Sequence, residues 1–311
     1  MLGTPLLKKV QLFYNKKKIR SISSKLLSHN EDAQRLYVGD NDKYDYFTGI
    51  IEAVGYIYIP STEYSKSGIA LSPSIQITIH SKDLPFMIKL FENFDGTLSK
   101  VKGKKAYRID LCSRSDIFKV IYILNGRLKT DLYNSFSSLI NWTNLYWGGK
   151  NQLECGYLCQ KPIGKTGWLS GFLEHHGSFQ LRYTPKTSTR IERFGCSLEL
   201  TQSHSQLIMR EIGEFLNSVP KIQNRKDRRN SLLRLRTSTV ESNLILINYL
   251  TNFPLYSSKL FEFEDWKEGA RLFEQKNHRT IRGRERLLEL KNRMNKRRVD
   301  FRWSHLKGFY F

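Results

Sequence analysis

A nine-residue pattern that carries possible metal ligands occurs twice, at 47–55 and at 169–177. Each copy reads as an apolar residue, a small residue, Gly, two apolar residues, Glu, two variable residues and Gly. Carboxylates are ligands for hard cations such as Mg²⁺, whereas imidazole suits softer metals. Glu52, Glu174 and His176 are therefore the candidates for metal-assisted chemistry, although a lone imidazole makes a poor Mg²⁺ site.

The cysteines offer no second metal site. Cys155 and Cys159 form a single C-x-x-x-C without a matching pair elsewhere, and Cys112 and Cys196 are scattered. A zinc site needs four converging ligands, so we predict ordinary reduced cysteines and no bound metal or other cofactor.

Each copy of the nine-residue pattern reads as a helix that runs directly into a strand. The first helix is predicted over 44–54, and the second ends at 176. After the first helix a strand is predicted around 56–59, and apolar and polar residues alternate over a further strand at 74–80. After the second helix they alternate over 178–184. Period-two alternation predicts a strand with one buried and one polar face. Because about 120 residues separate the copies, we interpret them as an internal repeat at the scale of a domain.

The duplicated pattern resembles that of the double-motif LAGLIDADG homing endonucleases and maturases of organelle introns. The resemblance covers roughly residues 44–310. It includes segments that look like closing segments of such halves, 123–130 and 139–142 in the first, and 243–250 followed by 254–259 in the second. It implies an α+β fold of two pseudo-symmetric halves, each αββαββα-like, with saddle-shaped antiparallel sheets. It also implies that the two motif helices pack at the centre of a monomer with internal pseudo-twofold symmetry.

The resemblance assigns a packing role to the motif glycines. In the family, the Gly at position three allows the two helix backbones to approach closely, and the Gly at position nine ends each helix. These positions are Gly49 and Gly171, and Gly55 and Gly177.

In active relatives the acid at position eight of each motif holds the metal that cuts nucleic acid, and here these positions are Val54 and His176. Val54 offers no ligand. Glu52 and Glu174 lie two residues earlier, which rotates their side chains by about 200° around the helix, away from the site. We therefore expect them to form local hydrogen bonds near the helix ends, and we predict no catalytic residues. We predict that His175 and His176 are surface or interface residues and not a pair of metal ligands.

The chain carries 51 Lys and Arg against 29 acidic residues, a formal charge of +22. Such an excess favours a polyanionic partner, with nucleic acid the first candidate and an anionic membrane surface the second. No stretch reaches 18 uninterrupted apolar residues, so we predict no membrane span. We divide the chain into a basic arm at 1–43, a first half at 44–147, a linker at 148–167, a second half at 168–276 and a basic extension at 277–311.

The predicted nucleic-acid contacts are basic residues of the arm, the loops and the extension, together with polar residues of the two sheet faces. They are Lys16, Lys17, Lys18, Arg20, Gln76, Thr78, Lys105, Arg108, Gln180, Arg182, Arg193, Arg225, Lys226, Arg228, Arg229, Arg234, Arg236, Arg282, Arg284, Arg297 and Arg298. Lys105 or Arg108, and Arg234 or Arg236, stand where active relatives place basic residues near the cut. Removal of 1–30 and 279–311 is expected to leave the body folded.

Three functions are compatible with these residues. The first is an inactive RNA binder of the mitochondrial matrix, encoded by the organelle. It would be either a component of the mitochondrial ribosome, in contact with rRNA and ribosomal proteins, or a group I intron maturase. The second is a DNA homing endonuclease that still cuts with a degenerate motif, and the third is a DNA binder without cleavage. Loss of both acids disfavours the second, and the long basic termini favour a large structured RNA.

Overall fold

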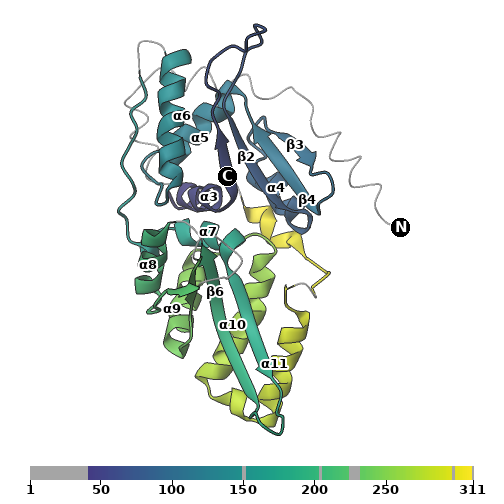
Figure 1. Cartoon of the computed structure of the whole chain (residues 1–311). Helices are drawn as coiled ribbons and strands as arrows, with labels where there is room; N and C mark the ends of the chain where they lie inside the picture. Colours follow the sequence, from purple (N-terminus) through teal and green to yellow (C-terminus); the bar gives the residue numbers. More distant parts are fainter. Residues whose placement is uncertain (1–40, 149–151, 203–204, 224–231, 296–297, 310–311) are drawn as a thin grey trace, which may run out of the picture. The chain divides into compact units, whose positions relative to one another are not determined.

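The computed structural model describes residues 41–148, 152–202, 205–223, 232–295 and 298–309, and these form two halves of like topology (Figure 1). In each half a motif helix runs into a four-stranded antiparallel sheet. Helices cover one face of each sheet and leave the other face to polar side chains. The predicted α+β fold with two pseudo-symmetric halves is confirmed.

The first half contains residues 41–146. Its sheet has the strand order β1-β2-β4-β3, in which β1 and β3 are the edges. Its elements are α3 (Asn41–Val54), β1 (Gly55–Tyr58), β2 (Ser74–His80), the 3₁₀ helix η2 (Ser81–Asp83), α4 (Leu84–Leu90), β3 (Thr97–Lys100), β4 (Ala106–Leu111), α5 (Arg114–Leu124) and α6 (Leu132–Tyr146).

The second half repeats this order and then continues. Its sheet is β5-β6-β8-β7, which matches the first strand by strand. Its elements are the 3₁₀ helix η3 (Ile163–Lys165), α7 (Trp168–His176), β5 (Ser178–Thr184), β6 (Arg193–Gln202), α8 (Gln206–Phe215), β7 (Lys221–Gln223), β8 (Leu232–Arg236), α9 (Val240–Asn252), α10 (Lys259–Glu274), the 3₁₀ helix η4 (Asn277–Arg279), α11 (Ile281–Arg293) and the 3₁₀ helix η6 (Trp303–Gly308).

Alternation along the strands sets which face of each sheet is buried. Ile75 and Ile77 of β2 are fully buried in the first core, and Phe179 of β5 is fully buried in the second. The intervening residues face the other way, because successive side chains of a strand point to opposite faces. The start of α9 is set locally, because the Thr239 side chain accepts a hydrogen bond from the Ser242 backbone N–H at 3.1 Å.

The two motif helices α3 and α7 cross in contact at Gly49 and Gly171. A Cβ atom built on Gly49 would lie 2.0 Å from the Trp168 carbonyl oxygen, and one on Gly171 would lie 1.9 Å from the Tyr46 carbonyl oxygen. Neither position has room for a side chain, so close helix packing requires glycine at both. The predicted packing of the motif helices against each other is confirmed.

Two aspartates of the first half also contact the second half. Asp83 of the first half accepts a hydrogen bond from the Ser258 backbone N–H at 2.8 Å. Asp131 accepts from both the backbone N–H and the hydroxyl of Ser205, each at 3.1 Å. Each contact pairs an acid of the first half with a serine of the second.

The segment after 276 is part of the folded body. Leu287, Leu290 and Met294 are buried in the second core, whereas Leu306 and Phe309 are buried in the first. The expectation that the body stays folded without residues 279–311 is therefore wrong, because their removal would expose the apolar surface that these side chains cover.

The described part of the linker is tied to the first half. Asn144 exchanges two hydrogen bonds with the Leu153 backbone, and Asn125 bonds the backbones of Glu154 and Gly156. Among the described residues, no helix is both long enough and apolar enough to cross a membrane.

Candidate nucleic-acid interface

Position eight of the first motif, Val54, packs against the first core at the foot of α3. Position eight of the second, His176, reaches across and hydrogen-bonds the backbone of Ala53, and its ring lies 4.7 Å from that of Phe172. Burial lowers the pKa of His176 to about 4, and the neighbouring His175 adds to this shift. The imidazole is therefore neutral at physiological pH.

These residues do not fit a hard metal ion at position eight. Mg²⁺ requires oxygen ligands in near-octahedral array, whereas Val54 has no donor and His176 is a neutral imidazole with one bond already made. Within the described ranges, no three His, Cys, Asp or Glu side chains converge in a way that could hold a metal.

The low pKa of His176 predicts how stability depends on pH. Below pH 6.5 the unfolded histidine gains a proton, whereas the folded one stays neutral until about pH 4, so acid favours unfolding across this window. We expect the unfolding free energy of the wild type to fall, relative to His176→Gln, by up to about 1.4 kcal/mol per pH unit between pH 6.5 and 4. Urea titrations at several pH values measure this difference. Parallel curves for the two proteins would show that His176 is not buried in neutral form.

Glu52, at position six of the first motif, is fully engaged by donors from elsewhere in the chain. Its carboxylate accepts hydrogen bonds from the Lys129 and Thr130 backbone N–H groups, at 2.9 and 2.6 Å, and from the Thr130 hydroxyl at 2.7 Å. The Trp168 indole N–H, on the other motif helix, donates at 2.5 Å. Burial raises the pKa of Glu52, and these donors oppose that rise.

Glu174, at position six of the second motif, repeats the arrangement. It accepts from the Tyr256 backbone N–H at 2.6 Å, from the Ser257 backbone N–H at 3.2 Å and from the Ser257 hydroxyl. The Tyr46 hydroxyl, on the first motif helix, donates at 2.6 Å. Burial again raises the pKa of this carboxyl, and the donors again oppose it.

Each position-six glutamate thus joins its motif helix to the closing segment of its own half and to the other motif helix. Tyr46 and Trp168 directly precede the two motifs, so the cross-helix bonds obey the same pseudo-twofold symmetry as the fold. The prediction of local hydrogen bonds was wrong, because the partners lie 77 to 128 residues away in sequence. Both carboxylates therefore act as hydrogen-bond acceptors that hold parts of the fold together.

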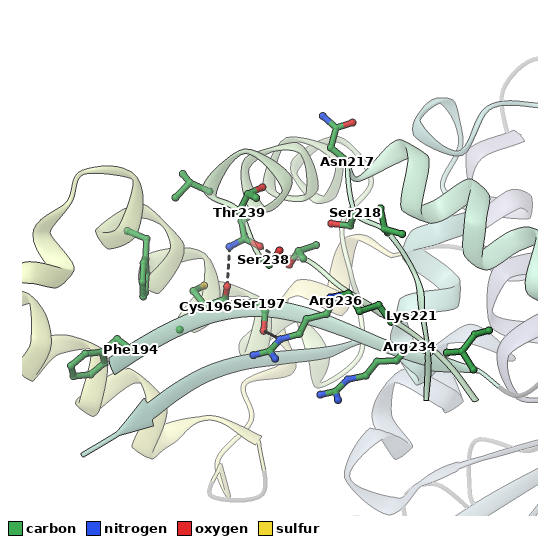
Figure 2. Close-up of a pocket in the computed structure, with 17 residues that line it drawn as sticks. Phe194, Cys196, Ser197, Asn217, Ser218, Lys221, Arg234, Arg236, Ser238 and Thr239 are labelled. Carbon is green, nitrogen blue, oxygen red and sulfur yellow. Dashed lines mark hydrogen bonds between the residues drawn. The ribbon is translucent and has the colours of Figure 1, made fainter. Parts of the chain in front are cut away.

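The polar face of the second sheet holds a cluster of arginines around one acid. Arg182 and Arg234 both donate to the same oxygen of Glu199, at 2.7 and 2.5 Å. Although burial raises the pKa of Glu199, hydrogen bonds and charge from Arg234 and Arg182 lower it below the ordinary value. Figure 2 shows Arg234 beside Arg236, whose Nε donates to the Ser197 hydroxyl at 3.3 Å. Of the predicted contacts, the structure brings Gln180, Arg182, Arg234 and Arg236 onto this face.

The polar face of the first sheet has a different chemistry. Arg108 donates to Asp110 at 2.9 Å, and Gln76 and Thr78 lie opposite these residues on the neighbouring strand. Lys105 is exposed in the turn that joins β3 to β4. The structure therefore brings Gln76, Thr78 and Arg108 together and places Lys105 at their margin.

The remaining predicted contacts divide into three groups. Arg193 and Arg282 are exposed, at the start of β6 and in the first turn of α11. Arg284 and Arg298 are used within the fold: Arg284 pairs with Glu192 at 2.7 Å, and Arg298 donates to the buried Asp265. The rest lie outside the described residues: Lys16, Lys17, Lys18, Arg20, Arg225, Lys226, Arg228, Arg229 and Arg297.

A cavity of about 720 Å³ opens beside the start of α9, next to the arginine cluster (Figure 2). Several polar groups of its lining already have partners. The Thr237 hydroxyl donates to the Asn243 side-chain oxygen at 2.6 Å and accepts from the Leu198 N–H at 2.8 Å. The Asn243 amide in turn donates to the Cys196 carbonyl at 3.1 Å. These bonds join β6 to the start of α9, so we interpret the polar groups as structural.

Sequence reasoning missed several residues of the two faces. Glu199, Tyr56, Tyr58 and Lys221 are not among the predicted contacts. The register places all four on the polar faces. Alternation in Gly55–Tyr58 is the one signal that was present, but four residues are too few to decide which side is buried.

Comparison with known proteins supports the repeat directly. A sequence model described as LAGLIDADG endonuclease matches residues 47–143 and again residues 169–270, so the two matches fall on the two halves. The chain belongs to the LAGLIDADG endonuclease family. This LAGLIDADG protein has one motif helix and the same strand order in each half, but lacks an acid at position eight in either motif.

Its relatives include nucleases and a maturase. It is 23% identical to the intron-encoded DNA endonuclease aI3 of Saccharomyces cerevisiae, covering 85% of this chain and 72% of that protein. It is 35% identical to the probable intron-encoded endonuclease Cox1-I1b of Schizosaccharomyces pombe, over 44% of this chain and 34% of that one. It is 23% identical to the intron-encoded RNA maturase bI4 of S. cerevisiae, over 50% of this chain and 22% of that one.

A solved structure shares the fold of this LAGLIDADG protein over most of its length. The crystal structure of the I-LtrWI LAGLIDADG homing endonuclease bound to target DNA superposes with a TM-score of 0.62 at 18% identity. The superposition covers 83% of this chain and 100% of that one.

Proposed function

We propose that this chain is a LAGLIDADG protein that has lost cleavage and binds structured RNA. The observation that carries the proposal is the chemistry of position eight. Val54 supplies no metal ligand, and His176 is neutral and bonded to the Ala53 backbone. The nearest carboxylates, Glu52 and Glu174, each accept four hydrogen bonds or more from the fold and cannot turn toward a metal without leaving those donors unpaired.

Retention of the polar sheet faces supports binding as the remaining activity. Arg182, Arg234 and Arg236 form a positive surface on the second sheet, and the chain as a whole carries +22. Charge of this kind neutralises phosphates and releases their counterions. An RNA maturase among the relatives supports RNA as the polyanion. We further propose a place in the mitochondrial matrix, and two roles stay open there: ribosomal component in contact with rRNA and ribosomal proteins, or group I intron maturase.

The second candidate is a DNA endonuclease with an altered site. A relative that aligns over 85% of this chain is an intron-encoded DNA endonuclease, which favours this alternative. It would require ligands from outside position eight, such as residues beyond the described ranges. The test below therefore measures cleavage and binding in the same samples.

The proposed function predicts that full-length protein with Mg²⁺ leaves all nucleic acids intact and binds RNA in preference to duplex DNA. We expect structured organellar rRNA or intron RNA to compete at least about tenfold better than duplex DNA of the protein's own locus, at equal salt. Gel assays of cleavage and competition titrations measure both properties. An active LAGLIDADG endonuclease on its own target is the positive control for cutting.

Two variants identify the binding surface in the same assay. Arg234→Gln combined with Arg236→Gln should weaken binding and reduce the slope of log affinity against log salt by about 1.4 to 1.8. Arg271→Gln removes an exposed charge from α10, on the side of the sheet away from the polar face, and should leave the slope unchanged. Metal-dependent cutting of DNA, or stronger binding to duplex DNA at every salt concentration, would contradict the proposal.

A further inference from the structure

The polar faces of the two sheets can be compared residue by residue, because their strands pair in the same register. Position nine of the motifs, Gly55 and Gly177, gives the common origin. Tyr56 follows the first of these glycines and pairs with Gln76 of the neighbouring strand. Ser178 follows the second and pairs with Glu199 of the neighbouring strand. Following the strand register from these two positions gives the residues that occupy equivalent positions in the first and second sheets. They are Tyr56 and Ser178, Tyr58 and Gln180, Gln76 and Glu199, Asp110 and Arg236, Arg108 and Arg234, and Ser99 and Lys221.

The comparison shows that the two faces differ in kind. The second carries Arg182, Arg234, Arg236 and Lys221 against the single acid Glu199. The strands of the first carry Arg108, which is paired with Asp110, and no further charge at the equivalent positions. In place of charge, the first face carries two aromatic rings.

Tyr56 and Tyr58 are placed to meet a ligand. They are 60% and 44% exposed, and as residues i and i+2 of β1 they lie on the same side of the sheet. β1 is an edge strand that directly follows motif helix α3, so both rings stand at the margin of the polar face close to the helix pair. Among the described residues, no ring pair, hydrogen bond or ion pair engages either side chain, whereas their counterparts Ser178 and Gln180 hydrogen-bond each other at 3.2 Å.

Paired and unpaired bases present different surfaces to such rings. In a duplex the flat faces of the bases are covered by their neighbours, and side chains reach only base edges and backbone. Unpaired bases in loops and bulges expose their faces and stack on aromatic side chains, a contact that tolerates any base. Two exposed tyrosines on the same side of one strand therefore suit unpaired bases better than a double helix.

We propose that Tyr56 and Tyr58 form a stacking site for unpaired bases of an RNA, while the arginine face of the second sheet holds the phosphates of the adjoining strand. The inference rests on the proposed function, since it names the part of the RNA that the first sheet contacts. The binding face is accordingly asymmetric: one half contacts bases through their flat faces, and the other contacts backbone through charge.

The test uses full-length protein and two RNA probes: a hairpin whose seven-nucleotide loop carries 2-aminopurine, and the same sequence closed into a continuous duplex. Stacking on a tyrosine changes the fluorescence of 2-aminopurine, so the probe reports the contact itself. We expect Tyr56→Leu and Tyr58→Leu each to weaken loop binding by about 5- to 100-fold and to abolish the fluorescence change. The matching Phe variants, which keep the ring, should stay within about twofold of the wild type.

Tyr157→Leu is the matched control, because Tyr157 is 90% exposed but lies in the linker and not on a sheet face. Asn125 and Asn144 hydrogen-bond this linker to the first half. It should leave binding unchanged, and duplex binding should be the same for all variants. Equal losses for Phe and Leu variants would show a hydroxyl contact instead of stacking, and unchanged loop binding in the Leu variants would remove the site altogether. A third probe, the loop as single-stranded DNA, separates the two proposals: if only this probe responds to the tyrosines, stacking stands and the RNA function falls.

Discussion

Gly49→Ala and Gly171→Ala are each expected to lower the free energy of unfolding by more than about 4 kcal/mol, or to prevent folding. The new methyl carbon would lie 2.0 Å from the Trp168 carbonyl oxygen in the first variant and 1.9 Å from the Tyr46 carbonyl oxygen in the second. Both atoms belong to helix backbone, so neither can swing aside as the end of a side chain would. The helices would have to separate, which would also lengthen the cross-helix bonds of Glu52 and Glu174.

Chemical denaturation followed by circular dichroism measures this effect, with soluble yield as a second readout where a variant fails to fold. Gly195→Ala is the matched control, because a Cβ at Gly195 meets only the Cβ of Arg182, at 3.8 Å, an ordinary contact. It should change stability by less than about 1 kcal/mol, in either direction. If Gly49→Ala and Gly171→Ala were equally mild, the helices would not be in backbone contact.

Glu52→Gln and Glu174→Gln are expected to destabilise the protein by about 3–5 kcal/mol each. Each carboxylate faces only donors, and glutamine replaces one of the two acceptor oxygens with an NH₂ group that would point at N–H or O–H groups. Charge-assisted bonds are lost, and at least one buried donor is left without a partner. The two variants should resemble each other, because the two glutamates have equivalent partners in the two halves.

Thermal and denaturant unfolding of the purified variants provides the measurement. Glu264→Gln, which breaks an exposed pair with Lys267 one turn along α10, is the control and should cost less than about 1 kcal/mol. Full stability in Glu52→Gln or Glu174→Gln would contradict the structural role. A folded variant that has lost metal-dependent cutting would instead show that position six has taken over catalysis, and would support the endonuclease alternative.

The sequence determines the local features of this protein, because they depend on spacing along the chain. The repeat of the nine-residue pattern identifies two motif helices, and the glycine at position three marks the face on which they meet. Alternation over 74–80 and 178–184 identifies strands and separates the buried isoleucines from the polar positions. The absence of an acid at Val54 and His176 is likewise readable without coordinates, since it depends only on comparison of the repeated motif with the motif of the LAGLIDADG family.

Only the tertiary structure decided what these residues contact. Rotation around a helix shows that Glu52 and Glu174 point away from position eight, but it does not show that their donors come from the closing segments and from Trp168 and Tyr46. Likewise, the basic composition after 276 predicted a separable extension, whereas the few apolar residues within it, such as Leu290 and Leu306, complete both cores. The physical reason is that sequence periodicity fixes the direction of a side chain relative to its own helix or strand. The partner it meets depends on how elements distant in sequence pack and in which register they pair.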